Sequence, residues 1–411
     1  MKTPIQLQEK ILITLVILLT ARLGIFIPVP GIDHNTFNNN LAQNSLLNFL
    51  NLFSGGGFST IGIFALGIVP YINGSIVIQL LTKIIPQLEQ LQKEEGELGR
   101  QQINQITRYL TVIWAILQSI GIALWLKPYV FTWNIYFLLD CILTLTTGSI
   151  IIMWFSEIIT EYGIGNGASL LIFQNIVSSL PKALQKYSIN FDNNQNVVSI
   201  TALTIFFLLI LTGTIMIQEG KRKILIISAK QLSKESKINP QSYIPLKINQ
   251  GGVMPIVFAS AAMALPPYLS QTLNDAISQQ IVSLFIPSSL LYIPLYCLLI
   301  ISFSYFYSSL ILNPTDIAKN LKKMGASIPG IRPGIETIKY LKKILSKLTL
   351  LGAIFLFAVA LIPPFISIIT NNPSFRGFGA TSLLILVGVA IDTAKQIQTY
   401  IISQQYDNMM E

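Results

Sequence analysis

The residue types that commonly carry catalysis or bind metals are scarce in this sequence. His34 is the only histidine, and no cysteine or second histidine lies near it in the chain, so neither a metal site nor a Ser–His pair has support. Cys141 and Cys297 both lie within apolar stretches, which favours buried small hydrophobic residues over a disulfide. We predict that the protein is not an enzyme and holds no metal or cofactor.

A glycine-rich segment, Gly163–Gly167, superficially resembles a phosphate-binding loop. No strand is predicted before it and no Lys-Ser/Thr pair follows it, so a tight turn between helices is favoured over nucleotide binding. Because no ATPase motif is found anywhere in the sequence, we expect the energy for any transport to come from a partner.

Ionisable side chains are rare within the apolar stretches. Asp140 and Asp392 are the clearest cases, with Glu157 and Arg22 near the ends of their stretches. Pumps and ion-coupled transporters place charged groups around a central site. This sequence shows no such relay, which counts against a pump.

The elements that carry these residues are membrane helices. The chain is 52% hydrophobic and 11% charged, whereas soluble domains carry about 25% charged residues. A membrane span needs about 20 mostly apolar residues. On that scale we predict ten spans, near 9–28, 64–85, 106–126, 133–158, 167–185, 197–217, 252–271, 282–312, 345–369 and 378–399.

The basic residues orient these spans. Ten spans place both termini on one side, which should be the cytosolic side because the basic segments fall in alternate loops. All but five of the 27 Lys and Arg residues lie on or next to that side, the exceptions being Arg22, Lys127, Lys182, Lys186 and Arg376.

Two predicted cytosolic loops, 218–251 and 313–344, hold most of this charge. Segments 221–247 and 319–347 together contain 15 of the 27 basic residues. Basic loops of this kind orient the chain and meet anionic lipid. They are also longer than a tight helical connection requires. A second interpretation is a docking surface for ribosomal RNA or an acidic protein.

Residues 29–63 are too polar to span a membrane and too apolar for a plain solvated loop. Two interpretations stay open: a short re-entrant element seated in a cavity, or an external amphipathic segment on the membrane surface.

Several ordered motifs resemble those of the SecY/Sec61 alpha family of protein-translocation channels. They cover nearly the whole chain and include Ala65–Ile72 with Ile78–Thr82, Glu95–Arg100, Thr107–Tyr109, Glu157–Gly167, Leu246–Ser260, Asn313-Pro314, Ile328–Gly334, Thr381–Ile385 and Ser403–Tyr406. Departures are modest: Ala380 and Ser156 stand where the family often has glycine, and Met254 and Val257 where isoleucine is common.

The resemblance implies an all-α membrane protein with two pseudo-symmetric, inverted five-helix halves around a central pore, here 1–187 and 188–411. It implies a plug near 51–64, which includes Asn51, Ser54, Gly55, Gly56, Gly57 and Phe58. It implies a pore constriction formed by Ile72, Ile76, Ile172, Ile176, Val257 and Ile385, with Met254 as a neighbour. A ring of aliphatic side chains suits varied cargo and gates small ions by dewetting.

The resemblance also implies the partners. Arg332 would engage the SecA motor, and Arg222 and Lys223 would dock SecA or the ribosome. The remaining expected partners are SecE, a SecG-like subunit, preproteins and membrane lipid, with no specific DNA binding.

We expect a channel that conducts unfolded preproteins and releases hydrophobic segments laterally. A small-solute secondary transporter and a passive ion channel are the rival hypotheses. We expect no transit peptide. The Ile-, Asn-, Gln- and Lys-rich composition and the start through Pro28–His34 resemble the plastid and cyanobacterial branch. The expected location is the thylakoid membrane, with a bacterial plasma membrane as the alternative.

Overall fold

The computed structural model describes residues 7–33, 61–94, 96–185, 208, 210–228, 243–252, 254–256, 258–259, 262–263, 291–369 and 380–410. The chain divides into two compact units. Unit 1 comprises Met1–Ile189 and Val389–Glu411, and unit 2 comprises Asn190–Gly388.

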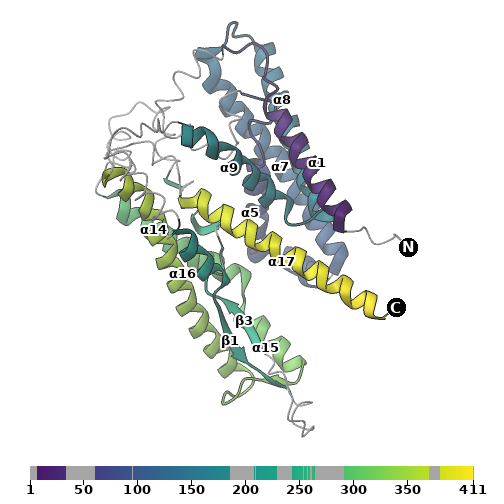
Figure 1. Cartoon of the computed structure of the whole chain (residues 1–411), viewed down its shortest axis with the longest axis vertical. Coiled ribbons are helices and arrows are strands. Elements are labelled where there is room, and N and C mark those ends of the chain that lie inside the picture. The colour runs from purple at the N-terminus through teal and green to yellow at the C-terminus, as the bar shows by residue number, and fades with distance from the viewer. Residues whose placement is uncertain are drawn as a thin grey trace. The chain divides into compact units, whose positions relative to one another are not determined.

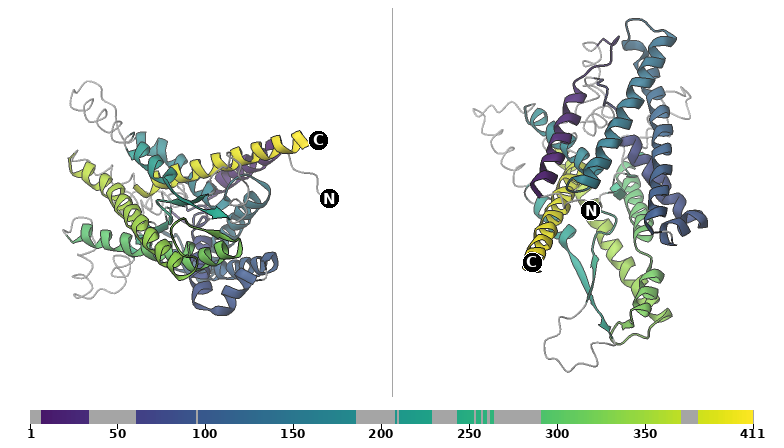
Figure 2. Two further views of the ribbon diagram at one scale, coloured as in Figure 1. Left: turned by 90° about the horizontal axis from the view of Figure 1, so that it is seen from below. Right: turned by 90° about the vertical axis from the view of Figure 1, so that its right-hand side faces the viewer.

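Unit 1 is helical in its described part (Figure 1). Its helices are α1 (Leu7–Ile25), α5 (Val69–Ile84), α6 (Pro86–Glu94), α7 (Gly96–Leu126), α8 (Ile135–Tyr162), α9 (Gly167–Gln185) and the C-terminal part of α17 (Ala380–Met410). A short 3-10 turn, η1 (Lys127–Tyr129), joins α7 to α8, and the two helices lie side by side (Figure 2).

Two apolar clusters hold unit 1 together. One joins α1, α8 and α9 around Ile17, Ile152, Ile159 and Leu170. The other lies under the α7–α8 hairpin, where Ala123, Leu126, Cys141 and Leu145 are fully buried. The burial of Cys141 confirms its prediction as a small core residue, and Cys297 is a half-buried free thiol.

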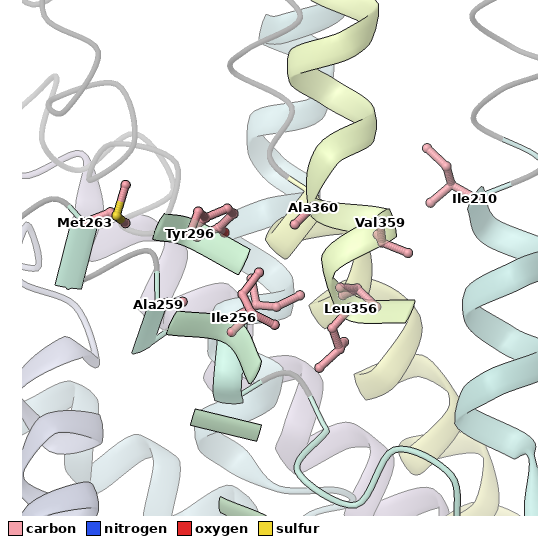
Figure 3. Close-up of a cluster of buried hydrophobic side chains, with 10 residues drawn as sticks. Ile210, Ile256, Ala259, Met263, Tyr296, Leu356, Val359 and Ala360 are labelled. Atoms are coloured by element: carbon pink, nitrogen blue, oxygen red, sulfur yellow. The ribbon is translucent and has the colours of Figure 1, made fainter. Parts of the chain in front are cut away.

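Unit 2 combines helices with two small sheets. The helices are α14 (Tyr292–Ile311), α15 (Pro314–Lys323), α16 (Ile335–Ile369) and the first turns of α17, and residues 210–219 are also helical. Ile256, Ile300, Leu356 and Leu384 form the centre of its apolar core, which Figure 3 shows in part.

The sheets are absent from the sequence-based prediction. β1 (Lys221–Leu225) pairs antiparallel with β3 (Tyr243–Lys247), and β2 (Ile227–Ser228) pairs antiparallel with β4 (Ala326–Ser327). The sequence predicts loops in both regions, because strands of two to five residues are too short to be detected from hydropathy. The β-branched residues of 224–228 are the local signal that could have revealed them.

Four described helical stretches are long and apolar enough to cross a membrane: Gly96–Tyr129, Ile135–Tyr162, Tyr292–Lys323 and Ile335–Leu361. Two helices begin well before the predicted spans. α7 begins at Gly96 rather than at residue 106, and α16 begins at Ile335 rather than at residue 345. Polar amphipathic turns continue these helices, and hydropathy does not detect them.

Candidate functional site

The predicted constriction residues of unit 1 lie on two helices. Ile72 and Ile76 are one turn apart on α5, and Ile172 and Ile176 are one turn apart on α9. Ile72 and Ile172 both pack against the cluster that joins α1, α8 and α9. Ile76 and Ile176 are buried, with exposed fractions of 9% and 3%. The fold therefore brings the predicted isoleucines Ile72 and Ile172 to one apolar cluster.

A tight chain of turns sets the start of α5. Residues 61–68 precede the helix, Gly67 has a φ of +53°, and its amide donates to the carbonyl of Phe64 (2.9 Å). Ser149 on α8 donates to the Gly67 carbonyl (3.3 Å). Pro70 then occupies the first turn of α5, where its missing N–H is not needed.

Close packing holds this segment against α8. A Cβ placed on Gly148 would overlap the carbonyl oxygen of Ile63, so α8 has room only for glycine there. Phe64 meets Phe155 edge to face, with ring centroids 6.5 Å apart. Contacts of segment 61–68 with α8 thus set where α5, which carries Ile72, begins.

The turn at 163–167 joins α8 to α9, as the sequence predicts. Asn166 Oδ1 accepts hydrogen bonds from the amides of Ala168 (3.1 Å) and Ser169 (3.4 Å), which caps the start of α9. The amide of Ile164 donates to Thr14 Oγ1 (3.1 Å), and that of Gly165 donates to Gln396 Oε1 (2.8 Å). Protein acceptors therefore occupy these amides, which is inconsistent with a phosphate cradle.

The other predicted pore residues are not all described. Ile385 is buried on α17 in unit 2, with an exposed fraction of 6%. Val257 and the plug residues Asn51, Ser54, Gly55, Gly56, Gly57 and Phe58 lie outside the described residues. Of the predicted plug segment 51–64, the structure describes residues 61–64.

The predicted docking residues lie on one small folded subdomain of unit 2. Lys221, Arg222 and Lys223 are all exposed on β1, whereas Ile224 is buried with an exposed fraction of 5%. The ammonium of Lys223 lies 4.9 Å from the centre of the Tyr243 ring across the β1–β3 pair. β1 therefore presents three cations on one short strand.

The two basic loops are joined, a contact that no pattern in the sequence predicts. Ile227 pairs with Ser327 and Ser228 with Ala326, so the β2–β4 pair links residues from both loops. Ile224, Leu246, Ile328 and Leu341 then share one buried cluster beneath the strands. We call this assembly of β1–β4, α15 and the first turns of α16 the basic subdomain.

Arg332 lies on an exposed turn of the basic subdomain. Gly330 and Gly334 flank it with φ values of +78° and +110°. Its carbonyl accepts a hydrogen bond from Thr337 Oγ1 (3.0 Å), which fixes the turn to the first turn of α16. The Arg332 side chain is therefore displayed from a rigid turn, as the Pro and Gly pattern predicts.

Comparison with known proteins agrees with the predicted resemblance. The SecY family profile matches residues 62–394. A relative described as "Protein translocase subunit SecY" from Pyropia yezoensis is 64% identical over 403 residues, which covers 98% of each chain. The chain belongs to the SecY family.

A second relative of the same description, from Synechococcus elongatus, is 52% identical over 415 residues and covers 98% of this chain and 94% of its own. Neither relative is described as a solute transporter.

Solved structures show the same fold. A structure described as "The structure of a protein conducting channel" matches with a TM-score of 0.67 at 18% identity, covering 98% of this chain and 94% of its own. A canine structure described as Sec61 in the ribosome-channel complex matches with a TM-score of 0.64 at 18% identity, with the same coverage. The chain thus has the all-α membrane fold of the SecY/Sec61 channel.

Proposed function

We propose that this chain is the pore-forming subunit of a protein translocase, through which unfolded preproteins cross a membrane and hydrophobic segments leave sideways into lipid. The observation that carries this proposal is the SecY family match over residues 62–394, together with the channel fold.

The pore constriction is proposed to comprise Ile72, Ile76, Ile172, Ile176, Val257 and Ile385. The shared apolar cluster of Ile72 and Ile172 supports this assignment. Branched aliphatic side chains offer no fixed ligand geometry, so they yield to varied cargo and exclude water when closed. A plug near 51–64 and two halves, 1–187 and 188–411, complete the proposed channel.

The basic subdomain is the proposed docking face for a translocation motor or a ribosome. Lys221, Arg222 and Lys223 on β1 and Arg332 on its turn are all exposed. Such a surface suits ribosomal RNA or an acidic protein face. SecA, SecE, a SecG-like subunit and the ribosome are the proposed partners, and a solved neighbour is described as a ribosome-channel complex.

The proposed location is the thylakoid membrane of a plastid. The relatives from Pyropia yezoensis and Porphyra purpurea, 64% and 63% identical, and the cyanobacterial relative support a plastid-type protein.

Reconstitution tests the proposed function. Vesicles that contain the chain and its small partner subunit should protect a signal-bearing precursor from external protease when SecA and ATP are supplied. A precursor without a signal, and vesicles without ATP, are the controls. Movement of a small solute without any protected precursor would overturn the proposal.

A further inference from the structure

A layer of neutral polar side chains lies within unit 2, next to its apolar core. Ser304 and Ser308 are one turn apart on α14, and Thr349 lies on α16. All three are buried, with exposed fractions of 5%, 7% and 6%. Ile300, one turn before Ser304 on the same helix, belongs to the apolar core. These hydroxyls need hydrogen-bond partners inside the protein, because a buried hydroxyl without a partner lowers stability.

The layer connects two helices to the segment 248–252, which leads into the predicted span 252–271. Thr349 Oγ1 donates a hydrogen bond to Ser308 Oγ (2.8 Å). Ser308 Oγ in turn donates to Gln250 Oε1, over a distance of 3.5 Å. One chain of polar groups therefore runs from α16 through α14 to Gln250.

The backbone around Gln250 is held in place by its neighbours. Asn249 Nδ2 donates to the Gly252 carbonyl (2.9 Å), which closes a turn across Gln250. A Cβ on Gly352 of α16 would lie 3.0 Å from the Ile248 carbonyl oxygen, so this segment and α16 are in close contact. The Gln250 side chain must therefore find its partners in its present surroundings.

Two donors of the layer lack a partner. Gln250 Nε2 and Ser304 Oγ are buried and make no hydrogen bond to any residue that the structure describes. The contact between Ser308 Oγ and Gln250 Oε1 is also longer than an ordinary O–H···O bond, which measures about 2.5–3.0 Å. The amide of Gln250 is thus weakly held at its oxygen and unpaired at its nitrogen. Water commonly bridges polar groups that are placed in this way.

We propose that Gln250 Nε2 and Ser304 Oγ bind one ordered water molecule, which completes a buried polar joint between segment 248–252, α14 and α16. A buried water makes about three hydrogen bonds. The Gln250 amide and the hydroxyls of Ser304 and Ser308 together supply that number. These groups are all neutral and include no carboxylate, so the site suits water better than a divalent cation.

The bound water gives the joint its strength. A bridging water is nearly as favourable in enthalpy as a direct hydrogen bond, so it ties the entry of the predicted span 252–271 to α14 and α16. The inference concerns the interior of unit 2 and does not depend on the transport activity proposed above.

A double-substitution cycle on the full chain in detergent tests whether the two groups share a water. Ser304→Ala and Gln250→Met, which keeps the length of the side chain, should each lower the temperature of thermal unfolding by roughly 2–4 °C. Each change removes one partner of the water and leaves the other donor poorly paired. The double variant should recover most of this loss, because neither donor remains.

Ser302→Ala, at an exposed serine two residues earlier on α14, is the matched control. It makes the same change in helix propensity, and its effect should add to that of Gln250→Met. Additive losses from Ser304→Ala and Gln250→Met would overturn the proposal. So would a larger gain in stability from Ser304→Ala than from Ser302→Ala, because removal of a bare buried hydroxyl stabilises a protein.

Cryo-electron microscopy of the unsubstituted full chain tests the site without any variant. A map that resolves ordered water elsewhere in unit 2 should show a peak within hydrogen-bond distance of both Gln250 Nε2 and Ser304 Oγ. A direct bond between these two groups, or no peak between them in such a map, would overturn the proposal.

Discussion

Arg108 Nε lies 2.8 Å from Glu157 Oε1 and donates a hydrogen bond to it, which joins α7 to α8. The two residues are 49 positions apart in the chain. The Arg108 side chain is 48% exposed and that of Glu157 21%, so water partly screens the pair. Its contribution is to align the two helices more than to add stability.

Removal of this ion pair should lower thermal stability slightly, and the effects of the two substitutions should not add. We expect Arg108→Gln and Glu157→Gln each to lower thermal stability in detergent by on the order of 0.5 kcal/mol. The double variant should lose no more than either single variant, because one interaction is removed in all three. Arg100→Gln, a change at an exposed arginine of α7, is the control. Strictly additive losses would show that the pair does not couple the helices.

Gly148 should not tolerate a side chain. A Cβ there overlaps the Ile63 carbonyl, so Gly148→Ala must displace α8 or the segment before α5. Overpacking of this kind costs about 1–3 kcal/mol, measurable as a lower temperature of thermal unfolding in detergent. Gly213→Ala is the matched control, because its Cβ would meet only Phe355 at 3.9 Å. Equal stability of the two variants would contradict the packing argument.

Arg332→Glu should weaken motor-driven transport several-fold. The side chain is exposed on a turn fixed by Thr337, so reversal of its charge alters docking and not folding. Precursor protection in vesicles measures the effect, and the amount of assembled complex reports folding. Lys127→Glu, at an exposed lysine of η1 outside both basic loops, is the control. A normal transport rate in the Arg332 variant would refute the docking role.

Ile72→Asn should raise the ion conductance of the closed channel. An amide in an apolar constriction favours water and weakens the dewetted barrier. Ile72→Val keeps the constriction apolar and should leave the conductance near its original value. Planar-bilayer recording measures the conductance of both variants. Equal conductance of the two would contradict the assignment of Ile72 to the constriction.

Deletion of residues 51–60 should also raise the ion leak, because it removes most of the proposed plug. The same recording measures it. Deletion of residues 229–238, an equal number from the segment between β2 and β3 that the sequence predicts to be a cytosolic loop, is the control and should leave the leak unchanged. An unaltered leak after the first deletion would argue against the plug assignment.

Local patterns in the sequence were sufficient for several features of this protein. The apolar runs predicted membrane helices over α7, α8, α14 and α16, because the bilayer demands about 20 apolar residues per span. The Pro and Gly residues around Arg332 predicted a tight turn, and Gly163–Gly167 predicted a connection between helices. Each of these depends on neighbours in sequence.

The tertiary structure decided what depends on distant residues. Pairing of Ser228 with Ala326 joins two loops nearly a hundred residues apart, and no local pattern encodes that contact. The ion pair of Arg108 with Glu157, and the placement of Ile72 and Ile172 on one cluster, likewise require the helices to be packed. The sequence alone determined that the chain crosses a membrane as helices, since the hydropathy of a span depends only on the residues within it. Only the folded chain shows which side chains meet, because packing joins residues by their positions in space.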